Sequence, residues 1–151
     1  ILGDALWYAQ ERFRAPVVID LATLTGAIVV ALGTEHAGLF VNSDELAAQI
    51  ENAAKVSGEK VWRMPLDDSF DEQIESDIAD IRNTSTVGRA GGAITAAAFL
   101  KRFVAPETKW AHLDIAGVAL QSKASLFGPK GASGYGVRLL NAFIRDSLEK
   151  K

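Results

Sequence analysis

The chain alternates short runs of consecutive apolar residues with longer stretches in which apolar residues recur every three or four positions. The short runs are typical of buried strands, and the recurring pattern is typical of amphipathic helices. The short runs predict strands at positions 17–19 and 38–42, and alternation of polar and apolar residues predicts one at 60–64. We also expect strands at 78–81 and 110–115. The recurring pattern predicts helices at positions 2–13, 27–32, 46–54, 93–103 and 137–148.

Strands and helices that alternate in this order predict an α/β fold. We expect a layered α/β/α arrangement, with a largely parallel or mixed central sheet and helices on both of its faces. The 151 residues are enough for one ordinary domain with a buried core. No internal repeat or linker divides the chain, so we treat residues 1–151 as a single domain.

One segment, residues 15–33, organises the rest of the chain. Its apolar run at 17–19 predicts a buried strand that ends at Asp20, and its apolar residues 27–32 predict a short helix. The polar turn at 23–26 lies between them. Ligands usually bind at such a turn in open α/β sheets, because backbone N–H groups at the start of the next helix are free. We therefore expect the ligand-facing surface at this turn.

Composition excludes several classes of partner. The chain has 16 Lys and Arg against 19 Asp and Glu, a net charge of −3, so it lacks the basic face that nucleic acid or an anionic membrane requires. Its longest apolar run, 27–32, is far shorter than the roughly 18 residues of a spanning helix. We expect no nucleic-acid or membrane partner. The absence of cysteine excludes disulfides and is compatible with a reducing cytoplasm.

Few residues offer obvious catalytic chemistry. The two histidines, His36 and His112, lie in different predicted elements, and His112 fits a structural position inside a strand. No G-x-S-x-G nucleophile signature is present. Acidic residues cluster between 67 and 80, but without the calcium-loop spacing, so a solvated helix start is the favoured interpretation over a metal site.

Two other features have open interpretations. Asp20 ends one predicted strand and Asp114 lies near the end of another, and together they could ligate a metal if these strands were neighbours. We favour a role as acceptors of hydrogen bonds from loop N–H groups. Gly91 and Gly92, next to Arg89, could bind an anion at a helix start, but we favour glycines that permit close backbone packing.

Three long motifs occur in order. They are V-I-D-x-A-T-L-T-G at 18–26, A-G-G-A-I-T-A at 90–96 and W-A-H-L-D-I-A-G at 110–117. In this the chain resembles the leucyl (cytosol) aminopeptidase family of dinuclear metallopeptidases. In that family an N-T-D-A-E-G-R motif, with two metal-binding carboxylates and a catalytic arginine, precedes a segment similar to residues 1–7. The resemblance implies the C-terminal portion of a catalytic domain, incomplete by itself and starting just after that motif.

The resemblance also implies a function. Members of the family are cytoplasmic, assemble as hexamers, and use two divalent ions, Mn or Zn, to remove N-terminal leucine-like residues from peptide substrates. None of the family's metal ligands or catalytic residues maps onto this chain, so we expect the chain alone to bind no metal and to be inactive. The alternative is a non-catalytic α/β module for assembly or ligand binding. A third hypothesis is an anion or nucleotide binder that uses 91–92 or 131–134.

The resemblance assigns five substrate-binding residues to this chain. They are Thr23, Leu24, Gly26, Ala116 and Ala119. The first two match positions whose backbone contacts the peptide, and the other three match the walls of a side-chain pocket. Two departures from the family pattern concern the same region. Ala119 stands where a bulkier residue such as Met is common, and S-G-Y-G at 133–136 replaces T-G-R-P, which we interpret as an equivalent start for the last helix.

Overall fold

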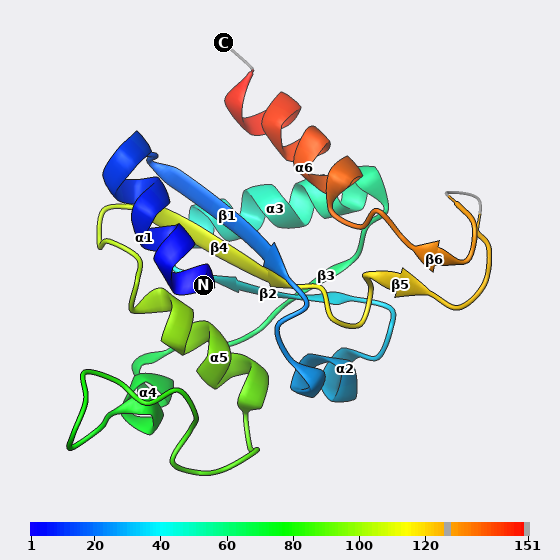
Figure 1. Ribbon diagram of the computed structural model, residues 1–151. Helices are drawn as coiled ribbons and strands as arrows, with labels where there is room; N and C mark the ends of the chain where they lie inside the picture. Colours follow the sequence, from blue (N-terminus) through cyan, green and yellow to red (C-terminus); the bar gives the residue numbers. More distant parts are fainter. Residues whose placement is uncertain (126–127, 150–151) are drawn as a thin grey trace.

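The structure, a computed structural model, describes residues 1–125 and 128–149. Its main sheet has four strands in the order β1-β4-β2-β3 (Figure 1). Their bounds are Val17–Ala22 for β1, Ala37–Val41 for β2, Val61–Arg63 for β3 and Lys109–Asp114 for β4. A separate two-stranded sheet pairs β5, Leu120–Gln121, with β6, Gly131–Ala132.

Helices connect these strands. Their bounds are Leu2–Phe13 for α1, Gly26–Leu32 for α2, Asp44–Ser57 for α3, Asp68–Asp71 for α4, Gly92–Lys101 for α5 and Val137–Phe143 for α6. A 3-10 turn, Glu72–Ile74, follows α4, and a π-helical segment, Ile144–Leu148, continues α6. Within the part of the chain that the structure describes, no helix is both long and apolar enough to cross a bilayer.

The main sheet is mixed, and β4 lies inside it. β4 runs parallel to β1 and antiparallel to β2, while β2 runs parallel to β3. Helices cover both faces, as the sequence predicted. On one face α3 and α6 pack on Leu39 and Leu113; on the other, α1, α2 and α5 pack on Phe40 and Trp110 (Figure 1). The α/β fold with layered helices is therefore confirmed.

The helix ends follow from local chemistry. The Ser43 side chain accepts a hydrogen bond from the backbone N–H of Leu46 and caps α3, and Gly58 ends that helix in the left-handed conformation. Thr25 caps α2 in the same way, by accepting from the N–H of Ile28. Short polar side chains accept hydrogen bonds from N–H groups that a helix start leaves unpaired. The starts of α2 and α3 could therefore be predicted from the sequence.

Two expectations about strands were wrong. Positions 78–81 form bends rather than a strand, and Ile78 is almost fully exposed, because none of the described strands pairs with this segment. β1 does not end at Asp20 but continues to Ala22, because the Asp20 carboxylate finds its partners inside the sheet. The connection between β4 and α6 contains the short strands β5 and β6; its residues 126–127 lie outside the described residues.

An apolar surface surrounds β1. Among the described residues this strand pairs on one side only, with β4, and all six of its residues are half-buried. The neighbouring helix α1 exposes three aromatic side chains, Trp7, Tyr8 and Phe13. An unpaired strand edge beside exposed aromatic rings is a surface that usually lies against other protein.

Candidate functional site

One buried carboxylate joins the two turns that carry the predicted substrate-binding residues. Asp114 ends β4 and is 1% exposed. Its Oδ1 accepts hydrogen bonds from the backbone N–H of Leu24 at 3.1 Å and of Ala116 at 3.2 Å, with the N–H of Thr25 at 3.5 Å. Its Oδ2 accepts from the Thr25 hydroxyl at 2.7 Å. The prediction that this aspartate accepts loop N–H groups is confirmed.

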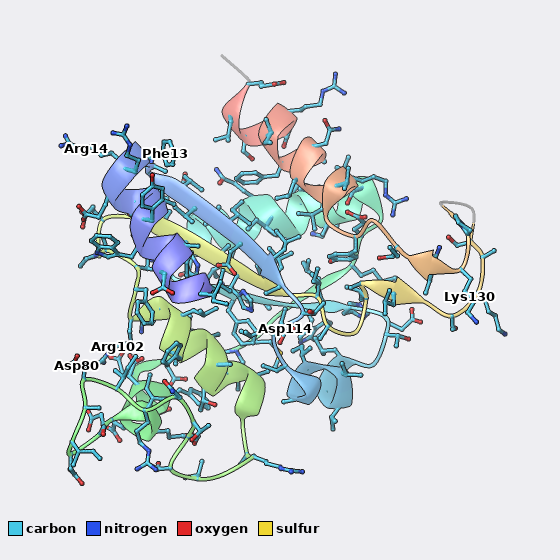
Figure 2. The ribbon with its side chains drawn as sticks, in the orientation of Figure 1. Phe13, Arg14, Asp80, Arg102, Asp114 and Lys130 are labelled. Atoms are coloured by element: carbon cyan, nitrogen blue, oxygen red, sulfur yellow. The ribbon has the colours of Figure 1, made fainter. Side chains whose placement is uncertain are left out.

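Strand register explains why the two turns meet. β1 and β4 are parallel neighbours, and Ala22 lies opposite Asp114. The carboxyl ends of parallel neighbours meet at the same edge of a sheet. The N–H of Ile115 donates to the carbonyl of Ala22 at 2.9 Å and extends the pairing by one step. The turn after β1 and the turn after β4 therefore leave the sheet side by side (Figure 2, where Asp114 is labelled).

The turn after β4 is fixed by further contacts. The N–H of Ala119 donates to the carbonyl of Ile115 at 2.9 Å, and the Ser133 N–H donates to the carbonyl of Ala119 at 3.0 Å. The Ser133 hydroxyl donates to the carbonyl of Val118 at 2.6 Å. Gly117 packs so closely that an added Cβ would lie 2.1 Å from the carbonyl oxygen of Gly33. We call residues 23–26 and 115–119 together the Asp114-linked turns.

The structure places the five predicted residues as follows. Leu24 and Ala116 are half-buried and share the Asp114 Oδ1 acceptor. Thr23 and Gly26 are exposed and flank them in the first turn, and Ala119 is half-buried in the second turn. The assignment of these residues to a substrate stays a prediction. The sequence analysis did not identify Ser133 and Gly117 as residues that hold the turn after β4 in place. The glycine of I-A-G could have indicated a close backbone approach.

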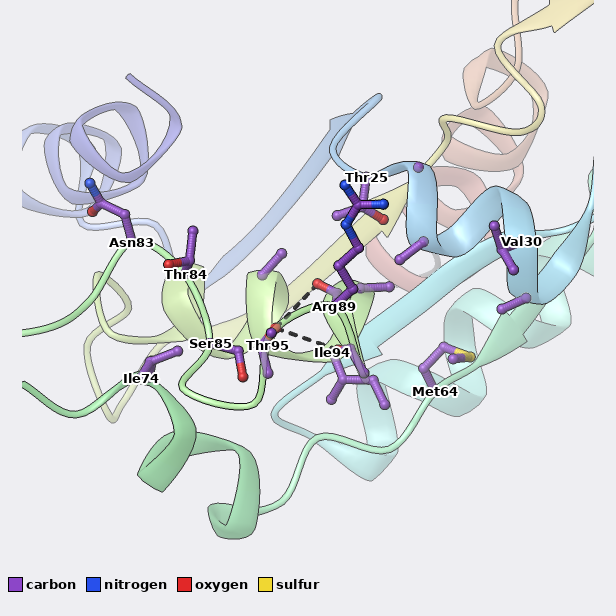
Figure 3. Close-up of a pocket in the computed structure, with 18 residues that line it drawn as sticks. Thr25, Val30, Met64, Ile74, Asn83, Thr84, Ser85, Arg89, Ile94 and Thr95 are labelled. Atoms are coloured by element: carbon purple, nitrogen blue, oxygen red, sulfur yellow. Dashed lines mark hydrogen bonds between the residues drawn. The ribbon is translucent and has the colours of Figure 1, made fainter.

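A cavity of about 850 Å³ adjoins the first turn (Figure 3). It lies between α2, the start of α5 and the loop at 83–91. Thr25 and Gly26 contribute to its wall, whereas Thr23, Leu24, Ala116 and Ala119 do not. Apart from Thr25, Thr95 and the loop's own residues, its lining is mostly apolar, with Val30, Met64, Ile74 and Ile94 among the larger side chains.

Asp20 has a different role from the one predicted. Its carboxylate binds side chains in the neighbouring strand, accepting from the Trp110 indole N–H at 2.7 Å and pairing with His112 Nδ1 at 2.5 Å. No loop N–H is among these partners. His112 is fully buried and stacks on Phe40 with ring centroids 5.9 Å apart. The prediction of a structural His112 agrees with this setting.

These contacts bear on metal binding. Asp20 lies opposite His112 in the register, and Asp114 lies two residues further along. The oxygens of both carboxylates are engaged by N–H and O–H donors, so neither carboxylate is free to hold a cation. Within residues 1–125 and 128–149, no group of three or more His, Cys, Asp or Glu side chains could hold a metal ion. The described residues therefore do not fit the two ions that the family uses.

The glycines at the start of α5 serve packing. An added Cβ on Gly92 would lie 3.3 Å from the Cβ of Ala27 in α2, and one on Gly91 would lie 3.3 Å from the Phe70 ring. Gly91 also has a positive φ of 61°. The interpretation that these glycines permit close packing is supported, and it explains how α2 and α5 approach each other at the cavity.

The start of α6 is held by a second buried carboxylate, which sequence reasoning missed. Glu59 is 4% exposed, and its Oε2 accepts from the backbone N–H of Gly136 at 3.1 Å and of Leu139 at 2.8 Å. Burial, and secondarily the negative charge of Glu59, raise the pKa of Tyr135 well above its ordinary value. Tyr135 thus stays protonated and donates its hydroxyl to the carbonyl of Lys60 at 2.7 Å.

We expect Glu59→Gln to lower the free energy of unfolding by about 2 kcal/mol, because an amide cannot accept all of these charge-assisted bonds. Thermal or urea unfolding of the purified protein measures the loss. Glu35→Gln is the matched control: its 3.5 Å ion pair with Lys60 is exposed, so it should cost less than about 1 kcal/mol. Equal effects of the two changes would contradict the capping role of Glu59.

Comparisons with known proteins agree with this fold. The chain matches the family model described as the cytosol aminopeptidase family, catalytic domain, over residues 1–141. It is 57% identical over 146 residues to a probable cytosol aminopeptidase of Rickettsia canadensis, covering 97% of this chain and 29% of the relative. It is 58% identical over 148 residues to one of Rickettsia felis, covering 98% and 30%.

A solved structure is also similar. A mutant of tomato leucine aminopeptidase superimposes with a TM-score of 0.86 at 47% identity, covering 95% of this chain and 27% of the tomato chain. The chain thus spans less than a third of the length of the relatives that it matches. On the family model and these identities, the chain belongs to the cytosol aminopeptidase family and corresponds to part of its catalytic domain.

Proposed function

We propose that this chain is the C-terminal portion of the catalytic domain of a metal-dependent aminopeptidase that removes N-terminal, leucine-like residues from peptides. In this proposal the chain supplies one wall of the substrate site, and residues outside it hold the metal ions. The observation that carries the proposal is the Asp114 carboxylate, which fixes both turns predicted to contact substrate in one place at the sheet edge.

The proposed wall has a simple chemistry. Asp114 immobilises the backbone of Leu24 and Ala116, so neighbouring backbone groups can bind an extended peptide without an ordering cost at each encounter. Gly26, Ala116 and Ala119 are small and leave volume for a leucine-like side chain. Burial of such a side chain is worth about 2 kcal/mol. We therefore propose a preference for apolar N-terminal residues.

The metals of the proposed enzyme are two divalent ions, Mn or Zn. Such ions polarise a scissile carbonyl and lower the pKa of an attacking water. Since the Asp20 and Asp114 carboxylates are engaged by other donors, this chain's part is to bind and orient the peptide, and we expect the chain alone to be inactive. The half-buried β1 and the exposed rings of α1 would lie against the rest of the catalytic domain. A cytoplasmic homohexamer is the proposed assembly.

The test uses the native protein that contains this sequence. Its intact mass is measured together with manganese-dependent hydrolysis of a leucyl amide, and we expect a mass well above 16.1 kDa together with activity. A mass of 16.1 kDa without activity would favour the non-catalytic α/β assembly or ligand-binding module. Activity at 16.1 kDa would contradict the proposal that residues outside this chain hold the metals.

A further inference from the structure

The proposed substrate wall does not explain the cavity beside the first Asp114-linked turn. The cavity has a volume of about 850 Å³ and lies beside α2 and the start of α5. It shares Thr25 and Gly26 with this turn. The proposed wall binds the side chain of the substrate's N-terminal residue, and no residue of the substrate precedes it. Any peptide that extends from the wall into this adjoining cavity therefore lies on the C-terminal side of the scissile bond.

A loop with fixed backbone forms the far side of the cavity. The N–H of Thr86 donates to the carbonyl of Gln73 at 2.9 Å, and the Ser85 hydroxyl contacts the Gln73 side chain at 3.3 Å. Gly88 and Gly91, with φ values of 73° and 61°, turn the chain on either side of Arg89. These φ values are unfavourable for other residues, so the two glycines define the loop that presents this arginine.

Arg89 alone is charged among the described residues that line the cavity. Figure 3 shows its side chain extending from the loop in the direction of the Thr25 turn. Within residues 1–125 and 128–149 it forms no ion pair, whereas the acidic residues of α4, Asp68 and Asp71, are paired with Lys101. The cavity therefore combines an apolar lining with one uncompensated positive charge.

A free carboxylate is the anion that a peptide would bring to this position. In a dipeptide or tripeptide, the C-terminal carboxylate follows the scissile bond by one or two residues, and a guanidinium binds a carboxylate through two parallel hydrogen bonds. We propose that Arg89 binds the C-terminal carboxylate of short peptide substrates in this cavity and so sets a preference for di- and tripeptides. This inference rests on the proposed aminopeptidase function and adds a specificity-determining residue to it.

The experiment compares two substrates that differ only in this carboxylate. Leucyl-glycine and leucyl-glycinamide are given to the native full-length enzyme and to its Arg89→Gln variant, and kcat/KM is measured for each. We expect the ratio of kcat/KM for the dipeptide to that for the amide to fall about tenfold in the variant, the size expected for loss of one charge-assisted bond. Arg89→Lys, which keeps the charge but not the paired donors, should lie between.

Arg102→Gln is the matched control, because this exposed arginine follows α5 and does not line the cavity. It should leave the substrate ratio unchanged. An unchanged ratio in Arg89→Gln, or an equal loss on both substrates, would overturn the inference and leave the proposed function standing. A wild-type enzyme that hydrolyses neither substrate would overturn the proposed function itself, so the two failures are distinguishable.

Discussion

Replacing Asp114 with alanine is expected to lower the free energy of unfolding by about 3–5 kcal/mol and to abolish peptide hydrolysis by the full-length enzyme. The change removes the acceptor for the N–H groups of Leu24, Thr25 and Ala116 and for the Thr25 hydroxyl, all at a site that is 1% exposed. Donors buried without an acceptor carry their full desolvation cost. Chemical unfolding and steady-state kinetics on the same preparation measure the two effects.

Two variants separate the contacts of Asp114 from a general effect of removing charge. Asp80→Ala removes a carboxylate from an exposed position in the outlying loop and should change stability by less than about 0.5 kcal/mol (Figure 2). Asp114→Asn keeps the shape and one acceptor oxygen, so it should lose about half as much stability as alanine. If Asp114→Ala unfolded like the wild type, the carboxylate would not be what joins the two turns.

Gly117→Ala is expected to destabilise the protein by about 3 kcal/mol, at the upper end for overpacking. The new Cβ would lie 2.1 Å from the carbonyl oxygen of Gly33, a backbone atom that cannot rotate away. Relief requires movement of either the second Asp114-linked turn or the turn that ends α2. We therefore expect kcat/KM for leucyl peptides to fall as well. Thermal unfolding and kinetics measure the two losses.

Gly26→Ala is the matched stability control. It introduces the same methyl group in the first Asp114-linked turn, where an added Cβ would meet nothing within 4 Å. Its unfolding temperature should stay within a degree or two of the wild type, because alanine is also the better helix former at the start of α2. If both alanines were tolerated equally, the close approach of Gly117 to Gly33 would not limit this region.

The sequence predicted the helices better than the sheet, for a local reason. Ser43 and Gly58 bound α3 through contacts within a few residues, and periodic apolar positions mark the buried face between them. Strand pairing depends on residues far apart, so residues 78–81 looked like a strand although no strand within residues 1–125 and 128–149 pairs with them. The two-residue strands β5 and β6 are too short to give any alternating pattern.

The site was predicted in part for the same reason. Asp114 lies near the end of a recognisable strand, so its role as an acceptor for loop N–H groups could be inferred. Asp20 looked equivalent in sequence, but its partners are side chains that only the register with β4 brings opposite it. The cavity walls come from three separate segments, α2, α5 and the loop at 83–91, and no single segment signals that they enclose a space.

The start of α6 agrees with one interpretation and adds detail to it. S-G-Y-G at 133–136 was expected to be equivalent to the family's T-G-R-P. Gly136 has a φ of 97°, which proline cannot adopt, and its N–H donates to Glu59, a bond that proline cannot make. S-G-Y-G thus leads into a helix, as expected, by a backbone path that a proline at position 136 could not take.

The central position of β4 has a consequence for synthesis on the ribosome. β1 pairs with β4 alone among the described strands, and Val17 lies opposite Lys109, so β1 emerges long before its partner exists. At roughly 5–20 residues per second, the nascent strand waits several seconds. During that interval its apolar residues are available to chaperones and to other nascent chains. Among the described strands of this sheet, the first is therefore the one that waits longest during translation for a partner along its edge.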